Sequence, residues 1–230
     1  MLTELKEQVL EANLELVRSG LVLFTFGNAS GIDRDRGLVA IKPSGVSYEQ
    51  MKPEDIVLVD MNGKIAEGSL RPSSDLATHL LLYKEFPSIG GVAHTHSEFA
   101  TAWAQAGKSI PPYGTTHADY FYGEIPVTGD LTQDEIEGDY VLNTGKAIVR
   151  RFQGIDPLSV PAVLVAGHAP FTWGTTAMSA AHHAALLETV ARMAYHTVTL
   201  NAACSPISQA LRDRHYHRKH GTKATYGQGS

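Results

Sequence analysis

The sequence has almost no cysteine, no long apolar run and no excess of basic residues. The single cysteine, Cys204, cannot form an internal disulfide framework, and it fits a reducing cytoplasm. No apolar stretch approaches the roughly 18–20 residues that a membrane span requires, so we expect no membrane partner. Residues 1–7 read as the start of an acidic helix rather than a signal peptide.

Net charge and the absence of two glycine motifs argue against nucleic acid and nucleotides as ligands. The 24 acidic residues outnumber the 19 basic ones, and a net charge of −5 argues against nucleic acid. The chain lacks the glycine patterns of dinucleotide sites and P-loops, so a nucleotide ligand is not expected. At 230 residues with 43% hydrophobic content, the chain predicts one domain spanning residues 1–230.

Apolar spacing and turn signals predict an α/β fold. Helices are expected near residues 5–16, 76–83, 99–105, 134–140, 144–152 and 178–200, the last with Leu186, Val190, Met193, Thr197 and Leu200 on one side. Two hairpins are expected over residues 29–42 and 56–66, the second around Asn62-Gly63, and residues 111–119 read as a loop. The interleaved elements predict helices on both faces of a mixed, largely antiparallel sheet.

Three histidines suggest a metal site. His94 and His96 follow the apolar run 89–93, and side chains two residues apart on a strand leave the same face. His168 ends a second apolar run, 162–167. Three imidazoles with an open position are typical of a catalytic zinc site. Asp75, at an expected helix start, is either a further ligand or a simple N-cap.

Other polar segments predict anion binding and proton transfer. Residues 42–45 (Lys-Pro-Ser-Gly) and 72–75 (Pro-Ser-Ser-Asp) are small polar turns, and such turns at a helix N-terminus suit an oxyanion. Asp119, among aromatic neighbours, is a candidate acid or base, although it equally suits a turn cap. The basic stretch 215–221 is either a solvated tail or a cover for an anionic substrate, where it would lower the pKa of Tyr226.

Six short motifs in order resemble the class II aldolase/adducin superfamily. They are residues 27–30, 42–45, 72–75, 94–97, 114–123 and 218–228. The last two narrow the resemblance to the L-ribulose-5-phosphate 4-epimerases, over essentially the whole chain.

The resemblance implies a three-layer α/β/α fold and a C4 homotetramer with active sites at the subunit boundaries. It implies a divalent metal, normally zinc, although cobalt or manganese would suit the same ligands. The ligands carried over are His94, His96 and His168, with Asp75 as a further carboxylate. Thr115, His215 and Arg218 join the implied sugar-phosphate pocket, which otherwise comprises Gly27, Asn28, Lys42, Ser44, Gly45, Ser73 and Ser74.

The implied reaction interconverts L-ribulose 5-phosphate and D-xylulose 5-phosphate by breaking and re-forming the C3–C4 bond. Asp119 and Tyr226, supplied by the neighbouring subunit, become the acid/base pair. Fuculose-phosphate aldolases carry a glutamate where this chain has Asp75, and the shorter side chain favours a ligand role. Such epimerases serve arabinose or ascorbate catabolism. The alternatives are an aldolase that releases its fragments and a non-catalytic adducin-like interaction module. No functional residue is carried over from residues 137–144.

Overall fold

The computed structural model describes residues 2–220 and residue 224. The strands are β1 (Asn28–Asp33), β2 (Leu38–Ile41), β3 (Val57–Asp60), β4 (Ile65–Glu67), β5 (Gly91–His94), β6 (Ala162–Leu164) and β7 (Pro170–Gly174). The helices are α1 (Leu2–Arg18), α2 (Leu76–Glu85), α3 (Glu98–Gln105), α4 (Thr115–Ala118), α5 (Gln133–Glu137), α6 (Tyr140–Arg151), α7 (Ala177–Leu200) and α8 (Gln209–Lys219), with a 3₁₀ turn at Pro53–Asp55.

The seven strands form one sheet in the order β4-β3-β2-β1-β5-β7-β6, and every named strand pair is antiparallel. A single parallel bridge joins Val127 to Leu164 at the β6 edge, within the described residues. The predicted mixed, largely antiparallel sheet is therefore confirmed. Both hairpins form, with Gly37 and Gly63 in the left-handed conformation that their turns require (φ 62° and 84°).

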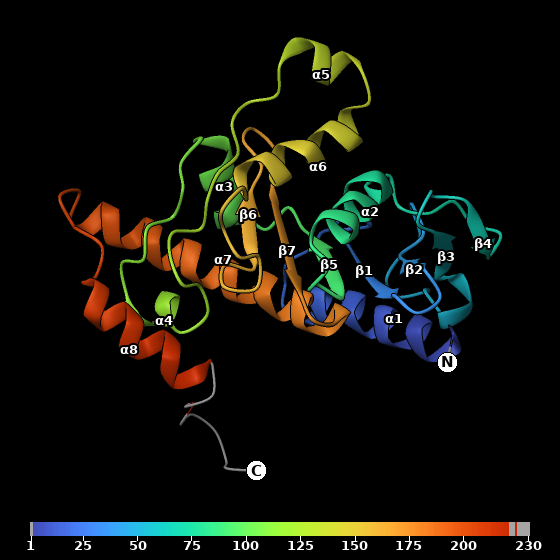
Figure 1. Ribbon diagram of the computed structural model, residues 1–230, viewed down its shortest axis with the longest axis horizontal. Coiled ribbons are helices and arrows are strands. Elements are labelled where there is room, and N and C mark those ends of the chain that lie inside the picture. Colours follow the sequence, from blue (N-terminus) through green and yellow to red (C-terminus); the bar gives the residue numbers. More distant parts are fainter. Residues whose placement is uncertain (1, 221–223, 225–230) are drawn as a thin grey trace.

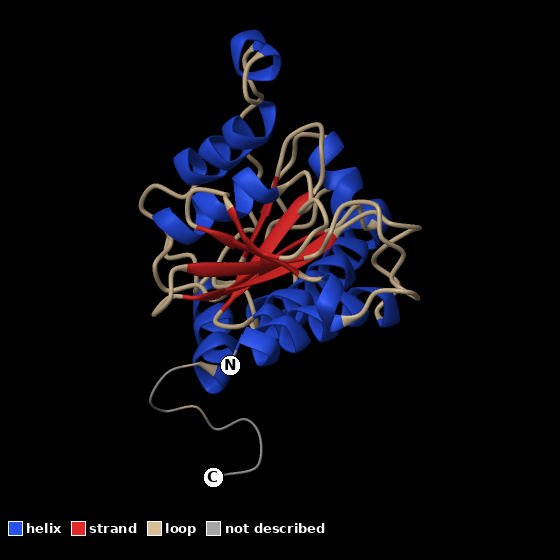
Figure 2. Ribbon diagram, turned by 90° about the vertical axis from the view of Figure 1, so that its right-hand side faces the viewer, coloured by secondary structure: helices blue, strands red, loops and turns tan. Residues whose placement is uncertain are grey.

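Helices cover both faces of the sheet (Figure 1). On one face α2 and α6 close a core with Val92, Phe171 and Trp173. On the other face α1 and α7 pack against Ala29 and Ala93. Figure 2 shows the strands between the two helical layers. This is the predicted three-layer arrangement, and no helix of the described residues is long and apolar enough to cross a membrane.

The buried side of α7 differs from the prediction. Of the residues expected on the packed side, Val190 is buried, but Met193 and Leu200 are 50% and 88% exposed, and alanines and Leu187 make much of the contact. At the start of α7 the helix approaches the sheet closely, since a Cβ on Gly91 would lie 2.4 Å from Ala177 Cα. Small side chains face the sheet there, and a pattern weighted by hydrophobicity did not select them.

Two segments after β5 also differ from the predicted secondary structure. The expected loop 111–119 contains the short helix α4, and the histidine-rich stretch from 215 to 219 belongs to α8 rather than to a tail. α8 packs on α4, away from the sheet (Figure 1). Tyr226 lies outside the described residues.

Candidate metal and anion site

One pocket of about 410 Å³ gathers most of the residues expected to bind the metal and the phosphate. It is lined by Thr25, Phe26, Gly27, Asn28, Lys42, Pro43, Ser44, Gly45, Ser73, Ser74, Asp75, His94, His96 and His168. These residues come from five separate stretches of the chain: the start of β1, the ends of β2 and β5, the start of α2, and the turn between β6 and β7. A pocket of this size suits a small polar metabolite.

Three imidazoles form a cluster at one side of the pocket. One ring nitrogen from each of His94, His96 and His168 lies within 4.8 Å of the other two. His94 ends β5, His96 follows two residues later, and His168 lies in the turn between β6 and β7. Because β7 pairs with β5, with Phe171 opposite His94, that turn is brought beside the other two histidines.

The imidazoles are prepared as neutral nitrogen donors. Burial lowers the pKa of His94 to about 3, and burial also lowers the pKa values of His96 and His168. His94 Nδ1 donates to the Pro170 carbonyl at 2.8 Å, which leaves its Nε2 lone pair facing His96 Nε2 at 3.2 Å. Neutral nitrogens with oriented lone pairs fit a divalent cation, since metal ligands must be unprotonated.

Asp75 lines the same pocket but is not a member of the nitrogen cluster. It stands at the N-cap position of α2, yet its side chain makes no capping hydrogen bond. Its Oδ2 instead accepts from Asn28 Nδ2 at 2.6 Å. Burial raises the pKa of Asp75, but His94, His79 and the Asn28 amide outweigh it and hold that pKa below its ordinary value. The carboxylate is thus available inside the pocket rather than used as a cap.

The two predicted anion turns lie side by side in the same pocket. A β-bridge joins Pro43 to Pro72, and Ser73 N donates to Lys42 O at 2.9 Å. Gly45 adopts the left-handed conformation (φ 72°). Hydroxyls, backbone amides and the start of α2 therefore converge on one volume, an arrangement suited to a phosphate group.

Lys42 supplies the positive charge of this pocket. The side chain is 2% exposed, and burial lowers its pKa to about 8. Its Nζ donates to the carbonyls of Thr25 and Pro43, each at 3.3 Å, and lies 4.7 Å from the centre of the Tyr48 ring. Within the described residues no carboxylate pairs with it. A buried ammonium with two long contacts calls for an anion as its ligand.

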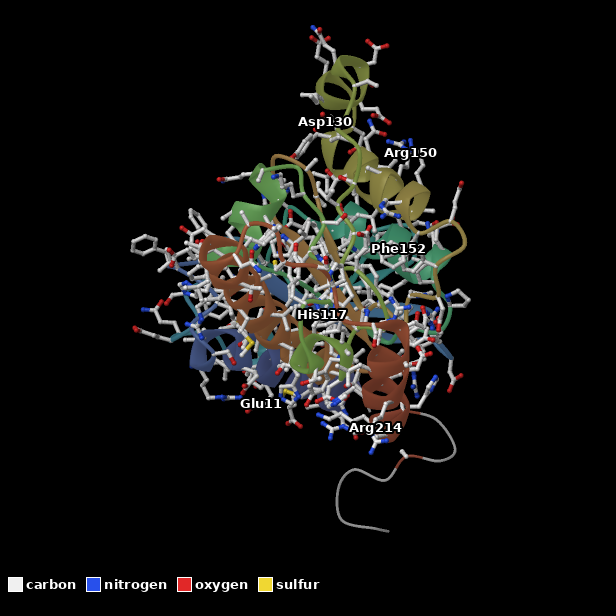
Figure 3. All side chains as sticks on the ribbon, turned by 90° about the vertical axis from the view of Figure 1, so that its left-hand side faces the viewer. Glu11, His117, Asp130, Arg150, Phe152 and Arg214 are labelled. Carbon is white, nitrogen blue, oxygen red and sulfur yellow. The ribbon has the colours of Figure 1, made fainter. Side chains whose placement is uncertain are left out.

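The remaining candidates form a second cluster, between α4 and α8. Asp119 accepts two hydrogen bonds from Arg218 at 2.9 and 3.1 Å and one from His215 at 3.0 Å. Burial raises the pKa of Asp119, but these donors and Lys219 lower it overall. None of these residues, nor Thr115, lines the metal pocket of the same chain. Figure 3 views this side, with His117 labelled on α4 and Arg214 on α8.

Sequence reasoning missed three residues around the pocket. Thr25 and Phe26 line its mouth, and the Phe26 ring lies 6.3 Å from that of His96. Their place directly before Gly27-Asn28 was the available signal. Tyr140 lies in the segment from which no residue was carried over, yet its hydroxyl is 3.4 Å from His168 Nδ1. The contact joins the first residue of α6 to the turn between β6 and β7, and no local sequence pattern predicts it.

The antiparallel sheet between two helical layers places three histidines able to hold a metal beside an anion pocket, the fold and site of a class II aldolase-like protein. The family model "Class II Aldolase and Adducin N-terminal domain" matches residues 7–195. The chain belongs to this family.

Named proteins with similar sequences indicate which members of the family this chain resembles in sequence. The L-ribulose-5-phosphate 4-epimerase UlaF of Salmonella paratyphi B is 56% identical over 225 residues, covering 98% of this chain and 99% of the relative. UlaF of Salmonella typhi is equally similar over the same coverage. Among solved structures, an L-fuculose 1-phosphate aldolase superposes with a TM-score of 0.78 at 25% identity, covering 94% of this chain and 95% of that one. YgbL from Klebsiella pneumoniae, a putative aldolase/epimerase/decarboxylase, shares the fold with a TM-score of 0.74 at 21% identity, covering 93% and 98% of the two chains.

Proposed function

We propose that the protein is an L-ribulose-5-phosphate 4-epimerase that interconverts L-ribulose 5-phosphate and D-xylulose 5-phosphate. The observation that carries the proposal is the convergence, in one pocket, of a three-imidazole cluster and the Lys42 anion site. The substrate follows from the relatives that are 56% identical over nearly the whole chain and bear this name. The single free cysteine supports a cytoplasmic location as part of the proposal.

The chemistry of the substrate dictates the route. The C4 hydrogen is not acidic, because no carbonyl is adjacent to C4, so direct deprotonation is unfavourable. Removal of the C4 hydroxyl proton instead lets the C3–C4 bond break, which yields glycolaldehyde phosphate and the enediolate of dihydroxyacetone. The aldehyde turns its other face to the enediolate, the bond re-forms, and the C4 oxygen regains a proton.

The residues of the pocket divide this work. Lys42 and the turns around Ser44 and Ser73 hold the phosphate, so that the aldehyde fragment stays bound while it rotates. His94, His96 and His168 would hold a divalent cation, for which we propose zinc, with Asp75 as a further ligand. When bound, that cation supplies positive charge to offset the negative charge that develops as the bond breaks.

Proton transfer requires two groups, because the C4 oxygen changes side during inversion. We assign Asp119 and Tyr226 to these roles, and both Arg218 and His215 to the surroundings of the phosphate. Asp119 does not line the pocket of its own chain, so a neighbouring subunit has to present it. Such sharing requires an oligomer with its sites at the subunit boundaries, and we propose the C4 homotetramer that the resemblance to the epimerases implies.

The reaction is tested with L-ribulose 5-phosphate carrying deuterium at C4. The cleavage route retains the label in D-xylulose 5-phosphate, and chelation of the metal abolishes turnover. Loss of deuterium to solvent would contradict C3–C4 cleavage. Rapid condensation of dihydroxyacetone phosphate with L-lactaldehyde would instead favour the aldolase alternative, and a protein that binds no metal would favour the interaction module.

Subunit sharing has its own test. His96→Ala and Asp119→Asn are each expected to be inactive alone. If the two residues act from different subunits, co-refolded mixtures regain activity, because about a quarter of the sites then combine two intact halves. Mixtures that stay inactive would place both residues within one subunit, against the proposal.

A further inference from the structure

A seam of buried polar side chains lies behind the metal pocket, between α2 and β1. Asp75, His79 and Tyr83 are spaced four residues apart and so project from one side of α2. Asn28 and Ser30 are two residues apart on β1 and face them. Ser30 Oγ lies 2.7 Å from His79 Nδ1 and 2.8 Å from the Tyr83 hydroxyl, and Asn28 contacts Asp75 as described above.

The seam fixes which nitrogen of His79 carries the proton. His79 is fully buried, and burial lowers its pKa to about 4, so the ring is neutral. If Nδ1 donated to Ser30, the Ser30 hydroxyl would donate to Tyr83, and the Tyr83 hydrogen would be left without an acceptor among the described residues. If Tyr83 donates to Ser30 and Ser30 donates to Nδ1, every hydroxyl hydrogen is used. Among the described residues the Nδ1–H form leaves two buried groups unpaired, the Tyr83 hydrogen and the Nε2 lone pair, whereas the Nε2–H form leaves only the Nε2 hydrogen. Because buried polar groups are almost always satisfied, the form with fewer unpaired groups is favoured, and the proton of His79 lies on Nε2.

That Nε2 is a buried atom with no partner among the described residues. The His79 ring packs edge-on against Phe171 at 6.0 Å, and Phe171 in turn stacks on His94 at 4.2 Å. The unpartnered N–H therefore lies directly behind the wall of the metal pocket. Burying a donor without an acceptor is costly, so a position that keeps one calls for an acceptor that arrives with the ligand.

The nearest charged acceptor on the same face of α2 is the Asp75 carboxylate, one helical turn before His79. Asp75 uses Oδ2 to accept from Asn28, and an ionised carboxylate can accept further hydrogen bonds.

We propose that His79 is a positioning residue for Asp75: the relay from Tyr83 through Ser30 holds its Nε2–H ready to bind that carboxylate when the site is loaded. His79 touches neither the metal nor the substrate. Its role is to fix the orientation of a group that does, as hydrogen-bond partners of metal-site carboxylates do elsewhere. The inference rests on the metal site of the proposed function, not on the identity of the sugar phosphate.

Two matched substitutions separate the two ring nitrogens. In His79→Gln the amide nitrogen reaches the place of Nε2, whereas in His79→Asn it reaches only the place of Nδ1. The dissociation constant of Zn²⁺ is measured on the full chain by competition with a chromophoric chelator. We expect His79→Asn to weaken zinc binding about 10–100-fold, and His79→Gln to stay near the wild-type value. Equal loss in both variants would overturn the proposal.

Coupling to Asp75 is tested with the same measurement in an Asp75→Asn background. If His79 acts through Asp75, His79→Asn costs little further zinc affinity there. An undiminished cost in that background would overturn the inference, since it would show a purely structural role.

The tautomer of His79 can also be measured in the wild-type protein, so this test does not depend on whether a variant folds. Long-range ¹⁵N–¹H spectra, with His79 assigned through its contact with Ser30, should show the Nε2–H form of the ring. The Nδ1–H form would reverse the relay and refute the proposal. Both readouts are independent of turnover, so a failure to epimerise L-ribulose 5-phosphate would contradict the proposed function alone.

Discussion

Replacing Lys42 by methionine should stabilise the free protein and impair binding of the phosphate. The ammonium is 2% exposed, and its two hydrogen bonds, both to carbonyls, are 3.3 Å long. Burial lowers its pKa to about 8 from the ordinary 10.5. Keeping the Lys42 ammonium charged therefore costs the folded protein free energy. Methionine has a similar volume and removes that charge.

The magnitude follows from proton linkage. The unfolded chain keeps the Lys42 proton up to about pH 10.5, whereas the folded chain releases it near pH 8. Between these values the unfolded state binds more protons, so the stability of the free protein rises with pH, and below pH 8 the full penalty applies. That penalty is at most about 3 kcal/mol. Loss of the hydrogen bonds to Thr25 and Pro43 offsets part of it, so we expect a gain of about 1–3 kcal/mol at pH 7.

Binding changes in the opposite direction. A phosphate restores a charged partner, so its affinity is greatest below pH 8 and falls as the pH rises further and Lys42 loses its proton. The wild-type KM should therefore rise above pH 8. In the variant KM should be about 10–100-fold higher at pH 7 and no longer change in this window.

Urea unfolding at pH 7, with KM measured from pH 6.5 to about 9.5, checks both parts. Lys84→Met, at an exposed lysine of α2, is the control and should alter stability by less than about 0.5 kcal/mol. A variant at Lys42 that is less stable than the wild type, or one that keeps the wild-type KM, would refute the reasoning.

Three further predictions test the site and the fold. His96→Ala should lose bound zinc and activity together, as measured by metal analysis and turnover, whereas the exposed His182→Ala should keep both; a metal-free His96 variant with full activity would contradict the metal role. Asp119→Asn should lower kcat about 10²–10⁴-fold in the epimerase assay, and a near-normal kcat would remove Asp119 from proton transfer. Gly91→Ala should destabilise the protein by about 2–3 kcal/mol in urea unfolding, because the new Cβ would lie 2.3 Å from Thr176 O. Gly114→Ala is the control and should not destabilise it, because the space around Gly114 is open. Equal stability of the two variants would contradict the close packing of α7 on β5.

Local signals account for most of the secondary structure. The turn at Asn62-Gly63 and the left-handed Gly37 set both hairpins, since only a few residues adopt positive φ without cost. Gly20 (φ 68°) follows the end of α1, where a glycine in the left-handed conformation commonly terminates a helix. These features depend on the backbone preferences of residues close together in the sequence, so they can be predicted from residue type alone.

The buried side of α7 could not be predicted in the same way. A hydrophobic scale ranks Met193 and Leu200 above alanine, yet both are exposed while alanines are buried, and at the start of α7 the close approach to Gly91 leaves room only for small side chains. Whether a helix packs closely on a sheet is decided by both partners, and the residues that match lie far apart in the sequence.

The sequence by itself determined which chemical groups are present: two histidines able to share one point, polar turns beside a lysine, and motifs ordered as in the class II aldolase family. Tertiary structure alone decided how these groups meet. Pairing of β5 with β7 brings His168 to the other histidines, and Asn28 turns Asp75 away from capping α2. Among the described residues, long-range pairing also buries Lys42 without a carboxylate partner and leaves Asp119 between α4 and α8, outside the pocket of its own chain. The physical reason is that distances across a sheet depend on strand order and register, which no local stretch of residues specifies.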